Sequence, residues 1–279
     1  TAKRQRQPNV EIWLPPEFQS TEQKWPVLIF SHGFGGCAKQ STFLMQYLAD
    51  HGYIVLAPDH ADARCNRGLG GGGLLQSFRP GMRDWPEKPF RSPESWDDKT
   101  EADRKDDVLF ALASMLDDRQ YKNYVDLDRM GLIGHSLGGY TVLGIAGAWP
   151  KWRDARFKAV LALSPYIDPF ISSRTLPKIG VPVMYEGGTK DDEITPSLRK
   201  QGYNQTRAPK YFMELDGGNH FAWTDANRDY QGVIEKTALQ FFDKYVKGAA
   251  VDILPEGQDK PGRPVNKVKT FWKDEGLKN

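Results

Sequence analysis

The sequence is poor in the features that would indicate a metal site, a nucleic-acid partner or a membrane span. Its two cysteines, Cys37 and Cys65, and its five histidines form no metal-binding motif such as C-x-x-C or H-E-x-x-H. The 38 basic and 36 acidic side chains leave a formal net charge of +2, which is too small to indicate binding to nucleic acid or to an anionic membrane. We therefore expect no metal, no cofactor and no nucleic-acid partner.

Long apolar runs are also missing. The chain has no stretch of about 18 apolar residues, so we expect no transmembrane helix and no stable membrane insertion. No signal peptide is visible, although a strand-like segment at 11–14 lies close to the first residue, as in a mature or trimmed chain. We expect a soluble protein, and the sequence leaves its export and its oligomeric state open.

What the chain does contain is an alternation of strand-like and helix-like segments. Short, continuous apolar runs at 27–30 and 53–57 are typical of strands that are buried on both faces of a parallel sheet. Helical spacing recurs between such runs, and a long amphipathic pattern covers 230–246. The alternation predicts a single α/β domain over 1–279, with a mostly parallel central sheet and helices on both faces.

Two segments depart from this alternation. Residues 60–103, after the second buried strand, contain four consecutive glycines, several prolines and two tryptophans, and they are too long for an ordinary connection. We predict that they form a lid-like or pocket-lining insert. Residues 248–279 are polar and contain proline and glycine, so they are predicted to be a C-terminal extension with a short helix near 268–272.

The segment 134–138, Gly-His-Ser-Leu-Gly, matches the G-x-S-x-G motif between a predicted strand and a predicted helix. A tight turn needs small neighbours, and the N–H groups at the start of a helix stabilise a developing negative charge. Ser136 is therefore the predicted nucleophile, and the Leu137 N–H is one predicted oxyanion donor. His135 points away from the nucleophile on such a turn, and we interpret it as a packing residue.

A serine hydroxyl needs a base to accept its proton and an acid to orient that base. In α/β hydrolases they follow the serine in the order acid, then histidine. His220 is the only histidine after the nucleophile and lies on a glycine-rich loop after a strand, so it is the predicted base. Asp191 and Asp192 are adjacent candidates for the acid, and Glu193 ranks third. Spacing alone does not choose between the two aspartates.

The loop 31–36, Ser-His-Gly-Phe-Gly-Gly, follows the first buried strand. This is the place from which a second backbone N–H reaches the oxyanion, and glycines allow the backbone to approach a substrate closely. We assign this donor to Phe34. His32 is interpreted as a hydrogen-bond partner that holds the loop.

These motifs resemble known groups of α/β hydrolases. The segments 134–141, 32–36 and 51–60 are similar to the dienelactone-hydrolase-like and platelet-activating-factor-acetylhydrolase-like group. The segment 214–221, Glu-Leu-Asp-Gly-Gly-Asn-His-Phe, is similar to bacterial polyester hydrolases and cutinases. The resemblance spans about residues 10–247 and implies an α/β-hydrolase fold and a serine carboxylesterase that forms an acyl-enzyme.

The resemblance also bears on individual residues. The polyester-hydrolase pattern G-x-x-x-D-x-x-x-P over 188–196 places the acid on Asp192, whereas a G-x-x-D pattern would favour Asp191, and Asp192 is the prediction. Tyr166, in Ser-Pro-Tyr, occupies the place of an aromatic residue that stacks on substrate, so it is a predicted pocket residue.

In this fold the loops after the first two buried strands are neighbours, and Cys37 and Cys65 lie on those loops. The resemblance therefore suggests the hypothesis of a disulfide that tethers the insert beside the oxyanion loop. The chain also differs from the families that it resembles. True dienelactone hydrolases use a cysteine nucleophile where this chain has a serine, and polyester hydrolases have a far shorter segment in place of the insert.

We predict a serine carboxylesterase that acts on a small-molecule ester. The alternatives are a cutinase-like hydrolase of polyesters or aromatic diesters and a phospholipid acetylhydrolase. A non-catalytic binding protein on a hydrolase scaffold is disfavoured, because no member of the triad is missing. The insert residues Trp85, Phe90 and Trp96 are predicted to cover or line the substrate pocket.

Overall fold

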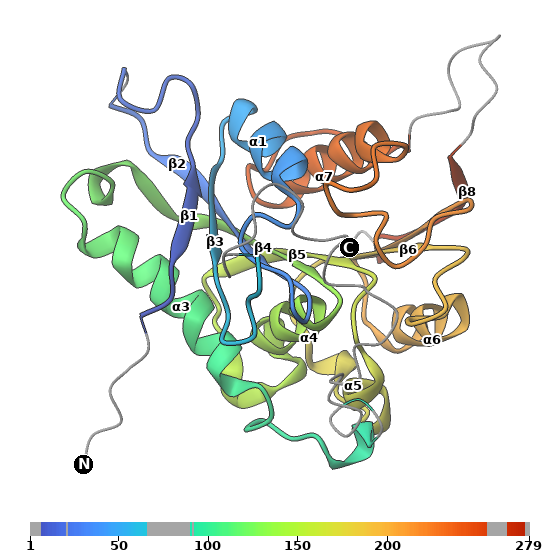
Figure 1. Cartoon of the computed structure of the whole chain (residues 1–279). Coiled ribbons are helices and arrows are strands. Elements are labelled where there is room, and N and C mark those ends of the chain that lie inside the picture. The colour runs from blue at the N-terminus through green and yellow to red at the C-terminus, as the bar shows by residue number, and fades with distance from the viewer. Residues whose placement is uncertain (1–6, 21, 66–89, 91, 256–266, 277–279) are drawn as a thin grey trace, which may run out of the picture.

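Figure 1 shows the chain as a computed structural model, which describes residues 7–20, 22–65, 90, 92–255 and 267–276. Within these residues one 8-stranded sheet has the order β1-β3-β2-β4-β5-β6-β7-β8. The strands are β1 (Val10–Trp13), β2 (Trp25–Ser31), β3 (Ile54–Pro58), β4 (Val125–His135), β5 (Phe157–Leu163), β6 (Val183–Gly188), β7 (Lys210–Leu215) and β8 (Val268–Asp274). The α-helices are α1 (Thr42–Asp50), α3 (Ala102–Asp117), α4 (Leu137–Leu143), α5 (Asp168–Ser172), α6 (Pro196–Gln205) and α7 (Gln231–Tyr245).

The six inner strands, β2 to β7, run parallel to one another, and the two edge strands, β1 and β8, run antiparallel to their neighbours. Every residue of β2 and β3 is buried. This burial explains the continuous apolar runs, because a strand covered on both faces cannot alternate apolar and polar residues. The parallel strands also bring their carboxyl ends to one edge of the sheet, where ligands bind in open α/β sheets.

Helices cover both faces of the sheet, as Figure 1 shows. One face packs against α1 and α7, and their buried side chains form a single apolar cluster with alternate strand residues; the cluster includes Leu28, Phe30, Leu44, Leu48, Ile133, Ile234 and Phe241. The opposite face packs against α3, α4, α5 and α6; its cluster includes Val27, Ile29, Leu112, Leu132, Tyr140, Phe170 and Tyr203. The predicted α/β-hydrolase fold, a mostly parallel sheet with helices on both faces, is confirmed.

The C-terminal segment corrects one expectation. The residues predicted to form a short helix near 268–272 form β8 instead, which pairs antiparallel with β7. The Trp272 ring stacks on that of Phe212 in β7, with ring centroids 4.9 Å apart. An edge strand offers a row of unpaired backbone groups, and pairing with it outweighs the weak helical tendency of such a short segment.

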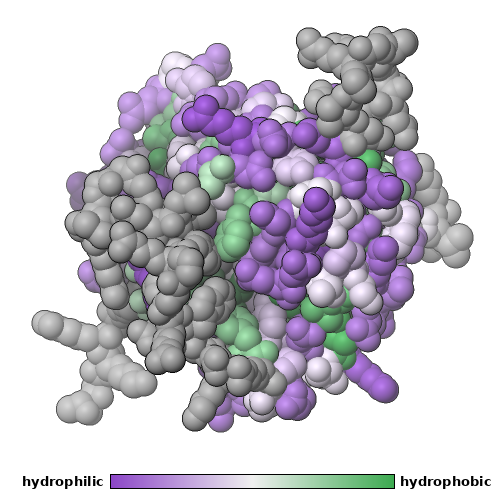
Figure 2. Space-filling view, turned by 45° about the vertical axis from the view of Figure 1, so that its right-hand side comes forward, coloured by the Kyte–Doolittle hydropathy of each residue, from purple (hydrophilic) through white to green (hydrophobic). Residues whose placement is uncertain are grey.

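The predicted insert, 60–103, is described at 60–65, 90 and 92–103, and Trp85 lies outside the described residues. Within the described part of the insert, a short 3-10 helix at Pro93–Ser95 precedes α3. On the face drawn in Figure 2 the described surface is mostly hydrophilic, with hydrophobic residues emerging in narrow strips. Among the helices in the described residues, none has the length and apolar character that crossing a membrane would require.

Candidate active site

Ser136 stands at the sharp turn between β4 and α4, with backbone angles of φ 54° and ψ −117°. A positive φ is costly for a residue that has a side chain, so the surrounding packing must hold it. The turn also requires glycine on either side. A Cβ atom at Gly134 would lie 2.2 Å from the carbonyl oxygen of Gly138, and one at Gly138 would lie 1.9 Å from the carbonyl oxygen of Ser31. The motif therefore has a steric cause.

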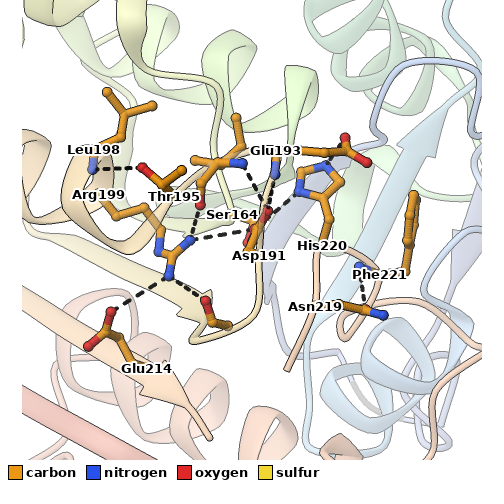
Figure 3. Close-up of polar contacts among 12 residues, drawn as sticks. Ser164, Asp191, Glu193, Thr195, Leu198, Arg199, Glu214, Asn219, His220 and Phe221 are labelled. Atoms are coloured by element: carbon orange, nitrogen blue, oxygen red, sulfur yellow. Dashed lines mark hydrogen bonds and ion pairs between the residues drawn. The ribbon is translucent and has the colours of Figure 1, made fainter. Parts of the chain in front are cut away.

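His220 and Asp191 meet beyond the ends of β7 and β6 (Figure 3), with His220 Nδ1 3.2 Å from Asp191 Oδ2. Both side chains are buried. Asp191 Oδ2 also accepts a hydrogen bond from the Ser164 hydroxyl at 2.6 Å, and Oδ1 accepts the backbone N–H groups of Glu193 and Ile194. Burial alone would raise the pKa of Asp191, but the hydrogen bonds from His220, Ser164 and Ile194 outweigh it and hold the pKa below its usual value.

The structure places Asp191, and not the predicted Asp192, beside the imidazole of His220. The carboxylate beside the imidazole belongs to Asp191, the alternative candidate, and Asp192 is exposed. The physical reason is local, because the two backbone N–H groups that bind Asp191 Oδ1 turn that side chain inward and its neighbour outward. Glu193 faces the other ring nitrogen, with Oε2 3.5 Å from His220 Nε2.

Arg199 holds the loop that carries the acid, although nothing in the sequence singled it out. Its buried guanidinium donates to the carbonyl oxygens of Ile194 and Gly188, the latter at 2.7 Å. It also lies 3.5 Å from Asp191 Oδ2 and 3.7 Å from Glu214 Oε1, as Figure 3 shows. The arginine on α6 therefore fixes the loop after β6 and neutralises two buried carboxylates.

The two predicted oxyanion donors lie on the expected turns. Leu137 is the first residue of α4, so its N–H has no partner within the helix. Phe34 follows β2 on the glycine-rich loop, and this loop reaches the nucleophile, because a Cβ atom at Gly33 would lie 3.3 Å from Ser136 Cβ. Backbone donors near the nucleophile on two sides can stabilise a negative charge that develops there.

Side chains from more distant segments hold this oxyanion loop. The Gly35 N–H donates to Asp62 Oδ2 at 2.7 Å. Asp62 pairs with the buried guanidinium of Arg104 on α3, whose other terminal nitrogen donates to the carbonyl oxygen of His32. A charged pair buried at the base of the loop thus fixes its backbone at two points.

The structure joins Cys37 and Cys65 in a disulfide, across a sequence separation of 28 residues. The Arg64 N–H donates to the carbonyl oxygen of Gly36 at 3.0 Å, and its guanidinium lies 5.7 Å from the centre of the Phe34 ring. The start of the insert is therefore bonded to the oxyanion loop through both backbone and side chains.

A second set of serine, histidine and aspartate, besides Ser136, His220 and Asp191, forms a buried hydrogen-bonded chain beneath the same loop. Ser31 Oγ is 2.8 Å from His60 Nε2, and His60 Nδ1 is 2.9 Å from Asp107 Oδ2. The His60 N–H donates to His32 Nε2, so the proton of His32 is on Nδ1, which donates to the carbonyl oxygen of Gly33. Burial lowers the pKa of His32 to about 4, in keeping with a neutral ring. Because Ser31 has no exposed surface, we interpret this chain as structural.

His135 is more than the packing residue that the sequence suggested. Its Nε2 atom lies 2.8 Å from the carbonyl oxygen of His220, and its Nδ1 atom lies 2.8 Å from Gln40 Nε2. Burial lowers the pKa of His135 to about 3, so the ring is neutral. His135 is a variable position of the G-x-S-x-G motif and Gln40 lies in no motif that we identified, so the sequence did not indicate these bonds.

Four aromatic rings pack against one another close to the turn of Ser136, and the Tyr166 and Trp96 side chains are buried there. The Tyr166 N–H donates to the carbonyl oxygen of Ser136 at 2.9 Å, which fixes this predicted pocket residue beside the turn. The Tyr166 ring lies 5.1 Å from Phe90 and 5.0 Å from Trp96, and the Phe90 ring lies 5.9 Å from that of Phe34. These four rings form an aromatic wall that runs from the oxyanion loop to the end of β5.

A buried acid lies behind the histidine loop. Glu186, in β6, accepts a hydrogen bond at Oε2 from Trp223 Nε1 at 3.0 Å, and its Oε1 lies 3.2 Å from the Thr237 hydroxyl on α7. Burial raises the pKa of Glu186 to about 7, because no cation offsets the loss of solvation. Trp223 follows His220 on the same loop, so the hydrogen bond to Glu186 anchors the loop to the sheet.

Within the described residues, no group of three or more histidine, cysteine, aspartate or glutamate side chains could hold a metal ion. The polar groups around the turn are instead paired with one another. The chemistry that this arrangement can perform is nucleophilic attack by a hydroxyl with a histidine as base and backbone donors for an oxyanion.

Comparison with protein families gives a match over most of the chain. The family model described as "Esterase: Putative esterase" matches residues 1–247. The match ends just after α7, so it includes every element that contributes to the site.

Curated relatives are similar at modest identity. The platelet-activating factor acetylhydrolase of Cavia porcellus is 23% identical over 221 residues, which are 74% of this chain and 49% of the relative. The cutinase est2 of Thermobifida alba is 26% identical over 206 residues, or 72% of this chain and 54% of the relative. The chlorophyllase type 0 of Chenopodium album is 24% identical over 160 residues, or 56% and 38%. The chain thus spans about half the length, or less, of these relatives.

The disulfide should be detectable in the purified protein. Under non-reducing conditions the intact mass should be lower by two hydrogen atoms than after reduction, and no thiol should titrate. Replacing both Cys37 and Cys65 by serine should lower the free energy of unfolding by about 2–4 kcal/mol, because the closed loop no longer restricts the unfolded chain. Two titratable thiols in the untreated protein would contradict the bond.

Glu186 should make stability depend on pH. Its pKa in the folded protein, about 7, lies above the usual value of 4.5, so its contribution is fully present below about pH 4.5 and is lost as the pH rises through about 7. The loss should approach about 3 kcal/mol in wild-type protein. Glu186→Gln stays neutral, so its unfolding free energy relative to wild type should rise from pH 5 to pH 8 in urea titrations. The control is Glu17→Gln, which alters an exposed side chain. If the unfolding free energy of Glu186→Gln relative to wild type were the same at pH 5 and pH 8, the assignment would be refuted.

Proposed function

This chain belongs to the esterase family, and on that premise we propose that it hydrolyses carboxylic esters with Ser136, His220 and Asp191 as its catalytic triad. The observation that carries the proposal is the pairing of His220 Nδ1 with the buried Asp191 carboxylate, beyond the same sheet edge as the strained turn of Ser136. The aspartate orients the imidazole and stabilises its protonated form.

The reaction would proceed in two halves. Ser136 Oγ attacks the ester carbonyl carbon while His220 Nε2 takes the hydroxyl proton, and the N–H groups of Leu137 and Phe34 stabilise the oxyanion. The intermediate expels the alcohol, which receives the proton from His220, and leaves an acyl group on Ser136. Water then attacks the acyl group, with His220 again accepting and returning the proton, which releases the carboxylic acid and restores the serine.

The aromatic wall favours an ester with an apolar or aromatic group beside the reacting carbonyl. The rings of Phe34, Phe90 and Tyr166 lie in sequence from the oxyanion loop to the backbone of the nucleophile, where such a group can pack. This chemistry suits an aromatic ester of the kind that a cutinase-like enzyme would accept. A phospholipid acetyl ester is the second candidate, since one of the relatives is named for that activity.

The nucleophile can be identified by covalent labelling. A fluorophosphonate probe should modify Ser136, and Ser136→Ala should lose both labelling and hydrolysis of a p-nitrophenyl ester, by about 10⁴-fold or more. The fold should persist, because alanine removes one hydroxyl from an otherwise unchanged turn.

Ser31→Ala is the matched control, because Ser31 lies in the second serine–histidine–aspartate chain. Its probe adduct should still map to Ser136. An adduct on Ser31 in wild-type protein would refute the assignment, and the absence of any adduct together with the absence of hydrolysis would favour the non-catalytic alternative.

The acid can be identified by a pair of neighbouring substitutions. Asp191→Asn should reduce kcat by about 10³–10⁴-fold, because the amide no longer fixes the imidazole tautomer. Asp192→Asn should change kcat by no more than about twofold, as expected for an exposed side chain. Steady-state kinetics on one ester would decide, and a larger loss in Asp192→Asn would reverse the assignment.

A further inference from the structure

A chain of side-chain hydrogen bonds passes beneath the nucleophile and links two distant parts of the site. The Gly33 N–H on the oxyanion loop donates to Gln40 Oε1 at 2.9 Å. Gln40 Nε2 lies 2.8 Å from His135 Nδ1, and His135 Nε2 lies 2.8 Å from the backbone carbonyl oxygen of His220. The links therefore run from the oxyanion loop to the proposed base, through the residue that precedes Ser136.

The protons in this chain can be arranged in one way. The Gln40 amide nitrogen can only donate, so His135 Nδ1 must accept, and the single proton of the neutral ring is then on Nε2. That proton points to the carbonyl oxygen of His220, which can only accept. The reversed amide would place its NH₂ group against the Gly33 N–H, with two donors facing each other.

The surrounding backbone leaves room for this chain. A Cβ atom at Gly33 would lie 2.9 Å from His135 Nδ1, and one at Gly36 would lie 2.3 Å from Gln40 Oε1. Glycine is therefore required at both positions for the two side chains to pass beneath the loop. Gln40 and His135 are both almost fully buried, at 4% and 2% exposure, so water does not compete for their hydrogen bonds.

A second set of bonds fixes the same two segments to each other. The Ser41 hydroxyl donates to the carbonyl oxygen of Trp223 at 2.6 Å, and the Asp225 N–H donates to the carbonyl oxygen of Gln40 at 3.2 Å. Asp225 also accepts the N–H groups of Thr42 and Phe43, which caps α1 from the histidine loop. The start of α1 and the histidine loop thus form one rigid unit.

We propose that Gln40 and His135 are positioning residues that hold the oxyanion loop and the base at a fixed separation on either side of Ser136. The proposal rests on the proposed function, because a base and an oxyanion donor must act together only in the transition state of acyl transfer. Neither side chain touches the substrate. Breaking the chain should therefore lower kcat much more than it changes KM.

Two substitutions break the chain at different links. Gln40→Met has the same length without the amide, and His135→Phe keeps a ring without its nitrogens. Each should reduce kcat by about 10–100-fold, since misplacement by about 1 Å is enough for such a loss, and KM should change by less than about threefold. The controls are Gln46→Met and His51→Phe, which alter exposed residues on and just after α1 and should leave both constants unchanged.

The double variant, which carries Gln40→Met and His135→Phe, distinguishes one connected hydrogen-bond chain from two independent packing effects. Two cuts in one chain should cost about as much kcat as the more damaging single cut, whereas independent packing losses should multiply. Melting temperatures measured in parallel give the folded fraction. If either single variant fails to fold, the test rests on Gln40→Asn, because it retains an amide that is too short to reach both partners and should show an intermediate loss of kcat.

The rate of fluorophosphonate labelling distinguishes this proposal from the proposed function. Labelling of Ser136 in wild-type protein with slower labelling in the folded variants would support the chain. Normal labelling and kcat within about twofold of the controls would overturn it and leave the triad intact, as would losses that multiply in the double variant. Failure of wild-type Ser136 to label would overturn both proposals.

Discussion

The strained turn at Ser136 is the constraint on which the rest of the site depends. Gly134 and Gly138 allow the start of α4 and the end of β2 to approach the turn so closely that no Cβ atom would fit at either position. This close packing holds Ser136 at φ 54°. The same close approach brings the oxyanion loop against the serine. A change that relaxed the turn would therefore move the nucleophile and at least one oxyanion donor together, because they share the contact.

Burial around this turn decides the charge of each group. His32 and His135 are buried where each ring has one accepting and one donating nitrogen, so both stay neutral. Glu186 is buried without a cation and keeps its proton to near neutral pH, whereas Asp191 is ionised because its hydrogen bonds, chiefly that from His220, outweigh the effect of burial. The sheet edge thus carries the ionised Asp191 beside the proposed base, while Glu186 behind it keeps its proton to near neutral pH, so negative charge lies where it can stabilise an imidazolium.

Much of this arrangement could be predicted from the sequence, and the exceptions have a common cause. The parallel sheet follows from apolar runs, and Ser136 and His220 stand out because each lies in a short local motif. The choice between Asp191 and Asp192 depends on which side chain the loop turns inward, and that is set by the backbone N–H groups two and three residues after Asp191. Gln40 and the strand at 268–274 depend on partners that are distant in sequence, His135 and β7, and Arg199 binds backbone carbonyl oxygens, so no local pattern indicates them.

The oxyanion loop on one side of Ser136 is rigid, so we expect substrate specificity to depend on the aromatic wall on the other side. The oxyanion loop is held by Gln40, by the Asp62–Arg104 pair and by the disulfide, so little of it is free to adapt to different esters. The aromatic wall is different in kind, because its rings contact one another and two of them, Phe90 and Trp96, belong to the insert. A preorganised oxyanion loop gives the same stabilisation to any ester carbonyl. On the proposed function, we therefore expect discrimination between esters to come from the wall, where the size and shape of the group beside the carbonyl would determine how many ring contacts it can make.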